Sequence, residues 1–392
     1  MNENMRMFAI ITAISTLTMI GGYFLAPIEV RFLKSFTENT ALIGLTYSVG
    51  AVFFALLSIY IGRLSATYGK KRFITIGTIA GIFYPLLFAN TINIFQYMGV
   101  KFVWAFAGAS TGPLLAAYLQ DTISKSKNKG TLLGVFHSVH AIAGSLGALL
   151  GGLISDAYGF RNAYVSAGYI LVLPCLLAII FIGFKDHEKK PKIKEKRSIL
   201  FSLKYVLSNP VLVFHLMINT VFGLNWSVKA ILYPLIVYEM AKSDAVTGSV
   251  FAVMGVTAAL VLPYAGRFID KKGYLKGAFI AYIVLGFASL GLALSTQVWM
   301  FFLFSAFVAV GEAFNGPVRG VIEIENIENK FRGEIIGFYT AWESTIGALS
   351  PLLAGLLLGF ISVKGVLFVY SVVILAGFLA ALRVLKSNYK IN

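Results

Sequence analysis

The sequence predicts an all-α membrane protein whose twelve transmembrane helices form two pseudo-symmetric six-helix bundles. Three observations support this fold class: a very apolar composition, a series of long apolar runs, and a set of glycine landmarks that occurs twice. Of the 392 residues, 58% are hydrophobic and only 13% are charged. A soluble domain would carry about a quarter charged residues, so this composition fits a lipid bilayer.

Twelve apolar runs are each long enough to cross a membrane as a helix, which takes roughly 18 residues or more. They cover residues 6–28, 40–62, 73–92, 97–119, 131–153, 162–184, 210–236, 246–266, 275–295, 299–321, 334–359 and 363–383. None of them alternates between apolar and polar residues, as the strands of a membrane barrel would. We therefore expect helices and no strands.

The glycine landmarks recur in the same order at an offset of about 204 residues. Gly62 and Gly69 return as Gly266 and Gly273, Gly112-Pro113 returns as Gly316-Pro317, and the run 144–152 returns as 347–355. Parallel repeats of one helical module are typical of membrane transporters. The sequence thus predicts two six-helix domains, residues 1–184 and 205–392, related by a pseudo-two-fold axis along the membrane normal. The charged segment 185–204 is the predicted linker.

The net charge of +16 is distributed as a membrane topology signal. Lysines and arginines gather in every second loop and in the linker, whereas the intervening loops hold only scattered ones, such as Arg31 and Lys101. Positively charged loops stay in the cytoplasm. We therefore expect a multi-pass protein of the cell (inner) membrane with both termini cytoplasmic. The basic surplus then faces membrane lipids, and we expect no nucleic-acid partner.

Cysteine content and motifs exclude several other functions. The one cysteine, Cys175, can form neither an intramolecular disulfide nor a thiolate metal site. No glycine-rich loop ends in Lys-Ser or Lys-Thr, so ATP is not expected to drive the protein directly. We predict that the protein is not an enzyme and that it needs no cofactor and no metal.

Two motifs resemble signatures of a known family. The stretch Gly62-x-Leu-Ser-Ala-Thr-x-Gly-Lys-Lys resembles the loop signature of the major facilitator superfamily, and its repeat at Gly266 resembles the weaker second copy. The run Ala143-x-x-x-Gly147-Ala-x-x-Gly-Gly152 resembles the fifth-helix signature of that superfamily's drug/proton antiporters. The resemblance implies a small-molecule substrate, protons as the coupling ion, and a central cavity lined by helices one, four, seven and ten. We also expect a monomer.

The chain departs from the family pattern at two positions. Ala66 stands where the loop signature has an aspartate, whereas the second copy keeps Asp270, and Trp104 replaces the helix-four arginine of that antiporter branch. We expect Asp270 to cap the N-terminus of helix five, around residues 128–130, when the cytoplasmic side is closed. The residues expected to act in gating are Gly62, Gly69, Gly266, Asp270 and Gly273.

Ionisable side chains inside the predicted spans are the candidates for proton coupling, because a charge within a bilayer is costly. They are Glu312, Glu343, His140 and Glu29. Glu312 lies near mid-membrane on helix ten, and Glu343 and His140 occupy equivalent places in the two repeats. The alternative for these residues is a polar contact between helices. For Glu29 the expected location is the outer interface.

The substrate-binding candidates are polar and aromatic residues on the helices expected to line the cavity. They are Glu312, Asn315, Trp226, Lys229, Asn219 and Trp104. The two tryptophans would suit stacking on a flat or cationic ligand. Lys229 has a second interpretation, in which its amine reaches the outer interface. Arg319 and Glu323 follow Glu312 on one helix face, and we expect them to form an ion pair with each other.

These observations favour a secondary active transporter that works by alternating access and exports lipophilic or cationic small molecules in exchange for protons. The alternative substrate is a small polar metabolite such as a sugar, whose cavity would need more amide side chains. An alternative of another class is a membrane receptor or assembly factor that transports nothing. The glycines retained in both halves argue against this last interpretation.

Overall fold

A computed structural model describes residues 3–123, 129–184, 199–328 and 331–388, and these residues form helices and connecting turns without a strand. The first bundle contains α1 (Glu3–Tyr23), α3 (Thr40–Tyr68), α4 (Lys70–Ala89), α5 (Ile94–Ile123), α6 (Lys129–Tyr158) and α7 (Phe160–Leu177), which continues as the π-helical turn η1 (Ala178–Ile182). The second contains α9 (Pro210–Ala241), α10 (Asp244–Lys272), α11 (Tyr274–Leu294), α12 (Val298–Asn326), α13 (Arg332–Leu357) and α14 (Val363–Asn388). Two short helices are α2 (Glu29–Lys34) and α8 (Ile199–Leu207).

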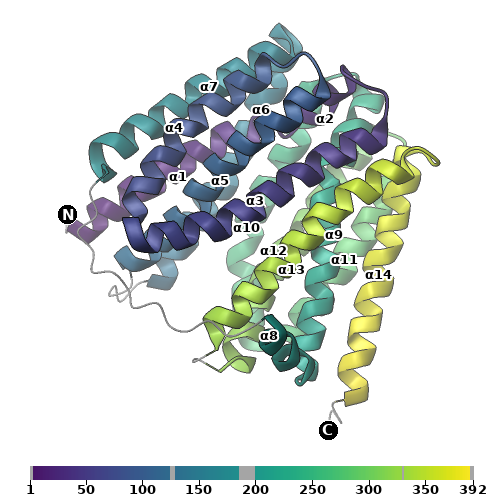
Figure 1. Cartoon of the computed structure of the whole chain (residues 1–392). Coiled ribbons are helices and arrows are strands. Elements are labelled where there is room, and N and C mark those ends of the chain that lie inside the picture. The colour runs from purple at the N-terminus through teal and green to yellow at the C-terminus, as the bar shows by residue number, and fades with distance from the viewer. Residues whose placement is uncertain (1–2, 124–128, 185–198, 329–330, 389–392) are drawn as a thin grey trace.

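The predicted fold class is therefore confirmed: twelve long helices form two six-helix bundles (Figure 1). Among the described residues, eleven of these helices are long and apolar enough to cross a membrane. The exception is α13, which is long enough but carries polar residues such as Glu343 and Ser344 near its middle. Residues 185–198 of the predicted linker lie outside the described residues, and its last residues belong to α8.

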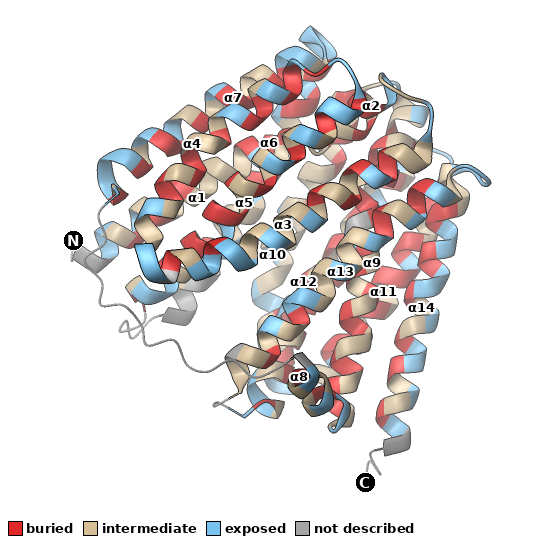
Figure 2. Cartoon of the chain, in the orientation of Figure 1, coloured by how far each residue is buried: buried red, intermediate tan, exposed pale blue. Residues whose placement is uncertain are grey.

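Large apolar side chains cover the outer faces of the helices. The most exposed of them include Leu56, Phe95, Tyr169, Leu260, Phe287 and Phe360. Figure 2 shows the buried residues gathered where helices face one another, with exposed residues on the outside of each bundle. In water such a surface would be unfavourable, whereas in a bilayer the lipid tails solvate it.

Local sequence signals place several helix ends. The Asn39 side chain accepts a hydrogen bond from the Leu42 N–H at the start of α3, and the Ser243 side chain accepts one from the Val246 N–H at the start of α10. Asn209 caps α9 and is followed by proline. Such residues satisfy N–H groups that have no partner within the helix. They fix where each span begins.

Two glycines separated by the repeat offset make the same tight turn. Gly69 joins α3 to α4 with φ 96° and ψ 141°, and Gly273 joins α10 to α11 with φ 84° and ψ 159°. This region of backbone space is open essentially to glycine alone. Each glycine N–H also donates to the carbonyl four residues earlier, over 2.9 and 2.8 Å respectively. The landmark is thus glycine in both repeats because the backbone requires it.

Gly69→Ala and Gly273→Ala should each destabilise the protein by about 1–3 kcal/mol, because a Cβ is strained at this backbone conformation. The measurement is the thermal unfolding midpoint of the purified protein in detergent. Gly62→Ala is the matched control, since Gly62 is helical and no atom lies within 4 Å of a Cβ placed there. Equal midpoints for all three variants would contradict this explanation of the turns.

The two bundles meet through pairs of helices that the repeat exchanges. The most extensive contacts between bundles join α6 to α10 and α3 to α13. Here the backbones approach closely: a Cβ on Gly152 would lie 2.2 Å from the Asp244 carbonyl oxygen, and one on Gly355 would lie 2.4 Å from the Thr40 carbonyl oxygen. Small residues permit such packing of helices in lipid. At this contact Gly152 of α6 faces the start of α10, whereas Gly147 and Gly151 of the same helix pack against the C-terminal end of α1 within the first bundle.

These close contacts lie at the end of the molecule remote from α8 and the linker. They involve the C-terminal half of α6 with the start of α10, and the start of α3 with the end of α13. Toward the linker the two bundles diverge (Figure 1). The structure is accordingly in a conformation that is closed at one end, with the bundles further apart at the linker end.

Candidate functional site

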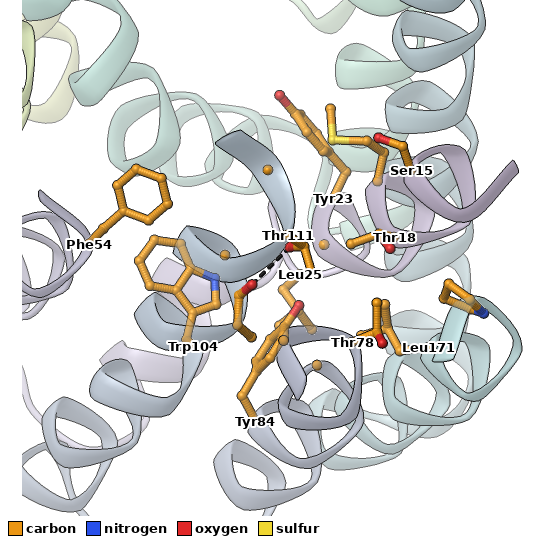
Figure 3. A pocket seen from close by; sticks show the side chains of 18 of the residues that line it. Ser15, Thr18, Tyr23, Leu25, Phe54, Thr78, Tyr84, Trp104, Thr111 and Leu171 are labelled. Atoms are coloured by element: carbon orange, nitrogen blue, oxygen red, sulfur yellow. Dashed lines mark hydrogen bonds between the residues drawn. The ribbon is translucent and has the colours of Figure 1, made fainter. Parts of the chain in front are cut away.

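Two neighbouring cavities occupy the middle of the molecule. The first, called here the central cavity, has a volume of about 370 Å³ and lies between the bundles, lined by α1, α6, α9, α10 and α12. The second, called the N-terminal chamber, measures about 380 Å³ and lies mainly among α1, α4, α5 and α7 of the first bundle (Figure 3). Both are lined by Met19, Tyr23, Ala26 and Ala230, so α1 and α9 form their common border.

An ion pair forms the polar part of the central cavity. The Lys229 ammonium on α9 lies 2.8 and 3.0 Å from the two carboxylate oxygens of Glu312 on α12. It also lies 3.8 Å from the ring centroid of Trp226, three residues earlier on the same helix. Asn225 approaches the carboxylate at 3.4 Å. The structure thus brings together three predicted substrate-binding residues, Glu312, Lys229 and Trp226, and Lys229 does not reach the outer interface.

A second buried ion pair lies in the first bundle, and the sequence analysis missed it. Lys101 on α5 pairs with Glu29 at the start of α2, and the Tyr97 hydroxyl donates to the same carboxylate over 2.8 Å. The Lys101 ammonium lies 4.8 Å from the ring centroid of Trp104. Glu29 lines the N-terminal chamber instead of the outer interface. Lys101 was assigned to a loop, although it falls inside the predicted span 97–119.

The two ion pairs join equivalent helices with opposite polarity. In the first bundle the acid follows helix one and the lysine is on helix four. In the second bundle the lysine is on helix seven and the acid on helix ten. At the repeat offset of 204, Glu312 corresponds to Gly108, seven residues from Lys101. Along helices four and ten the two pairs are therefore displaced by about 10 Å, at 1.5 Å per helical residue.

Glu343 belongs to a different polar cluster, within the second bundle. Arg319 of α12 donates to its carboxylate oxygens over 2.7 and 3.3 Å. The predicted partner of Arg319, Glu323, instead lies 3.6 Å from the buried ring of His215 on α9. The expected Arg319–Glu323 pair was therefore wrong. Glu343 stands on α13 with its charge already matched by an arginine, and it lines neither cavity described above.

His140 lines the central cavity from α6. Its Nε2 is hydrogen-bonded to the Ser15 hydroxyl of α1 at 2.5 Å, and its Nδ1 lies 2.7 Å from the Phe136 carbonyl oxygen. Its repeat partner Glu343 is bound in the cluster of the second bundle. The two residues are on equivalent helices but do not form one site.

Two predicted substrate ligands are buried in helix packing instead. Asn315 accepts a hydrogen bond from the Tyr282 hydroxyl at 2.5 Å. Asn219 is fully buried on α9. Neither lines the central cavity or the N-terminal chamber. Helical spacing predicts that they share a face with Glu312 and Trp226, but at their positions that face is directed toward the interior of the bundle. We therefore leave both out of the candidate binding site.

A polar network holds the closed end together, and the sequence analysis did not find it. Asp156, near the end of α6, accepts hydrogen bonds from the N–H groups of Asp244 (2.7 Å) and Ala245 (3.0 Å) at the start of α10. Arg31 of α2 pairs with the Asp244 carboxylate, which also accepts from the Ser155 hydroxyl over 2.8 Å. A carboxylate at a helix N-terminus is favoured by the free N–H groups and the helix dipole. The sequence signal that could have revealed this network is Asp156, an acid near the end of the predicted fifth helix.

The predicted cytoplasmic latch is the same type of contact at the opposite end. Asp270 is exposed in this conformation. Residues 124–128, which include the first of the N–H donors expected for it, lie outside the described residues, as does the side chain of Ala66. Gly62 and Gly266 face open space on α3 and α10. The roles of these residues and of Asp270 in gating stay predictions that concern the alternative conformation.

Asp156→Ala should favour opening of the closed end, because it removes the acceptor of two N–H groups. Loss of a helix cap of this kind is worth about 0.5–2 kcal/mol. The measurement is the labelling rate of Ala245→Cys by a membrane-impermeant maleimide in a Cys175→Ser background. Asp121→Ala, which removes an exposed acid at the linker end of α5, is the control. Identical labelling rates in both variants would contradict a role for the network.

Comparisons with known proteins agree with this architecture. The sequence profile described as Major Facilitator Superfamily matches residues 11–225 and 216–390. An uncharacterized MFS-type transporter of Methanocaldococcus jannaschii is 24% identical over 379 residues, which cover 94% of this chain and 95% of that protein. The multidrug resistance protein MdtG of Salmonella arizonae is 25% identical over 318 residues, 79% of this chain and 77% of that protein.

Solved structures show the same fold at low sequence identity. The nucleoside transporter NupG superimposes with a TM-score of 0.80 at 12% identity, covering 96% of this chain and 99% of that one. A bacterial homolog of the human lysosomal transporter Spinster gives 0.77 at 13% identity and covers both chains completely. The expectation that the protein is not an enzyme is confirmed by the family match. With two bundles, a central cavity and a profile that spans nearly the whole sequence, the chain belongs to the major facilitator superfamily of membrane transporters.

Proposed function

We propose that the protein exports lipophilic or cationic small molecules in exchange for protons. The observation that carries this proposal is the composition of the central cavity. The one acid in its described lining, Glu312, sits beside Trp226 among apolar side chains such as Phe222, Phe251 and Met254. Such a site offers a single negative charge for a cation and apolar and aromatic surface for the rest of the cargo.

Competition for the Glu312 carboxylate supplies a coupling mechanism. A carboxylate in an apolar membrane cavity needs a positive partner or a proton. In this conformation the partner is Lys229. An arriving cation takes the place of the Lys229 ammonium, which lies 3.8 Å from the Trp226 ring centroid and can stay on that aromatic face. A proton that neutralises Glu312 then releases the cation. Lys229 thus serves as an internal substitute for the cargo between transport cycles.

Alternating access would use the interface described above. The glycine contacts and the Asp156 network close one end, and the Asp270 latch would close the other. With the linker and both termini in the cytoplasm of a cell with an inner membrane, the present conformation faces the cytoplasm. We propose residues 1–184 and 205–392 as the two moving bodies of a monomer, with the segment between them as a connector.

A polar metabolite is the less favoured cargo. Sugars are held by multiple hydrogen bonds, yet the described lining of the central cavity includes neither asparagine nor glutamine. The two asparagines expected there are buried elsewhere. The printed name of the MdtG relatives, multidrug resistance protein, supports the lipophilic class. A receptor or assembly factor without transport activity would not need a bundle interface closed at one end only.

The test is flux into proteoliposomes that contain the purified protein. Ethidium and tetraphenylphosphonium serve as lipophilic cations, and glucose and uridine as polar cargo. An imposed pH gradient should drive accumulation of the cations above the level in protein-free vesicles and should leave the polar compounds unmoved. If glucose or uridine is transported and the two cations are not, the cargo is a polar metabolite instead. If all four compounds enter no faster than they enter protein-free vesicles, with or without the gradient, the result would favour the receptor or assembly factor.

A further inference from the structure

The walls of the N-terminal chamber include glycines that helix packing does not require. Gly22 on α1, Gly81 on α4 and Gly112 on α5 line the chamber, and no atom lies within 4 Å of a Cβ placed on any of them. By contrast, a Cβ on the nearby Gly77 would lie 2.4 Å from the Ser110 Cβ. Glycines in membrane helices usually permit close helix contact. These three instead leave flat stretches of bare backbone facing an open space.

Aromatic side chains form the remaining large surfaces of the chamber. Tyr84 of α4 and Trp104 of α5 lie around the space shown in Figure 3, with Phe54 of α3 beyond the tryptophan. Phe88 also lines it. Aromatic rings favour stacked or edge-to-face contacts with other rings. Flat backbone together with aromatic faces is suited to a planar ring system. A volume of about 380 Å³ falls within the range of small-molecule sites.

The acid and the serine and threonine hydroxyls of the chamber already have partners. The hydroxyls of Thr18, Thr78 and Thr111 each donate over 2.8 Å to a carbonyl of their own helix. Ser15 is hydrogen-bonded to His140, and Glu29 is paired with Lys101. A ligand there would find no uncompensated charge, and the polar groups left to it are on the aromatic residues Tyr23, Tyr84 and Trp104. The chamber is therefore suited to a neutral, largely apolar group.

The chamber adjoins the ion pair of the central cavity across α1. Tyr23 and Met19 of α1 and Ala230 of α9 line both spaces. Ala230 directly follows Lys229, so the common border lies next to the ion pair. A molecule that spans this border would place one part among the aromatic rings of the chamber and another part beside Glu312.

We propose that the N-terminal chamber is a binding site for the planar aromatic part of the cargo. The site is formed by Gly22, Gly81, Gly112, Tyr84 and Trp104. The cargo is then a two-part molecule, a flat aromatic ring system in the chamber with a positive group at Glu312. The aromatic binding site is inferred from the chamber alone, and only the positive group at Glu312 rests on the proposed function.

Two probes with the same ring system test the halves separately. Phenanthridine is planar and neutral at pH 7.5, and ethidium carries the same rings with a permanent positive charge. Binding is measured on the purified full chain as saturable quenching of Trp104 fluorescence, after Trp226, Trp299 and Trp342 are replaced by phenylalanine. Gly112→Leu fills the chamber without striking a neighbouring atom at its Cβ. Gly99→Leu is the matched control on the same helix, exposed and also without a neighbour within 4 Å.

Gly112→Leu should weaken the binding of both probes about tenfold or more, as expected when methyl groups fill an apolar pocket, and Gly112→Ala should cause a smaller loss. Gly99→Leu should change neither by more than about twofold. If Gly112→Leu and Gly99→Leu differ in thermal unfolding midpoint, binding by Gly112→Ala is compared with that of the unmodified protein instead. Equal effects of the position 112 and position 99 variants would overturn the chamber proposal. So would saturable quenching by a nitroxide-labelled fatty acid but not by phenanthridine. The variant Glu312→Gln/Lys229→Met tests the proposed function separately. If this variant binds ethidium as tightly as the unmodified protein, Glu312 does not bind the cation and the proposed function fails. Phenanthridine binding still tests the chamber in that case.

Discussion

Glu312→Gln should reduce proton-driven accumulation of lipophilic cations to the level of protein-free vesicles. Glutamine keeps the approximate size and hydrogen-bonding capacity of the side chain but can neither bind a proton at neutral pH nor attract a cation by charge. The measurement is ethidium uptake into proteoliposomes under an imposed pH gradient. Since the amide retains this size and hydrogen-bonding capacity, the sequence alone predicts that the variant folds normally. The ion pair with Lys229 changes that expectation.

Removing the carboxylate leaves the Lys229 ammonium, whose side chain is only 10% exposed, without its partner. Breaking a buried ion pair from one side costs about 3–5 kcal/mol, whereas replacing both partners by uncharged groups is much less harmful. The double variant Glu312→Gln/Lys229→Met should therefore recover the thermal stability that Glu312→Gln loses, yet it should remain inactive in proton-driven uptake. This pattern separates a role in coupling from a role in folding.

The first bundle supplies the matched control. Glu29→Gln/Lys101→Met neutralises the equivalent ion pair of opposite polarity, of which Glu29 lines the N-terminal chamber, away from the proposed cation site. This variant should retain proton-driven uptake. Uptake that survives loss of Glu312 but fails in the Glu29 variant would transfer coupling to the first bundle. Uptake that survives in both would leave Glu343 and His140 as the remaining candidates.

The sequence was sufficient for the fold because its signals are local or repetitive. Apolar runs specify spans, and the shared turn at Gly69 and Gly273 shows that a repeated landmark reports a repeated backbone conformation. The glycine face around Gly152 was also predicted, since small residues at helical spacing indicate close packing. These inferences need no knowledge of which helices meet.

Most of the candidate site could not be derived in this way, because its contacts join distant parts of the chain. Glu312 and Lys229 were both named, but their pairing depends on how α9 and α12 are rotated. Lys101 shows the clearest error: a lysine near the end of a predicted span was assigned to a loop, although its partner in the first bundle is Glu29. Helical spacing likewise placed Asn315 beside Glu312, while the tertiary structure turned it toward Tyr282.

Gly152→Ala should shift the protein away from the conformation described here and toward one that is closed at the linker end. A Cβ at this position would lie 2.2 Å from the Asp244 carbonyl oxygen, and a backbone atom cannot move aside as a flexible side chain can. Overpacking of this kind costs about 1–3 kcal/mol, which corresponds to a change of roughly 5- to 150-fold in the equilibrium between two conformations. The penalty disappears once the bundles separate at this end.

The symmetric half of the interface makes the same prediction independently. Gly355→Ala would place a Cβ 2.4 Å from the Thr40 carbonyl oxygen, so it should shift the equilibrium in the same direction. Spin labels at Tyr68→Cys and Ile324→Cys, in a Cys175→Ser background, report the separation of the two bundles. Both positions are exposed, near the linker-side ends of α3 and α12. The distance between these labels should shorten in either variant.

Labels at Glu38→Cys and Phe360→Cys report the opposite end, where the same two variants should lengthen the distance. Gly99→Ala adds a methyl group to a helix position with no neighbour within 4 Å and should leave both distances as in the unmodified protein. Opposite changes at the two ends are the signature of rocking about the cavity. If both distances lengthened together, the added methyl groups would be loosening the bundles, and the glycine face would serve packing alone. The coupled change therefore decides whether this surface is the one on which the transporter alternates.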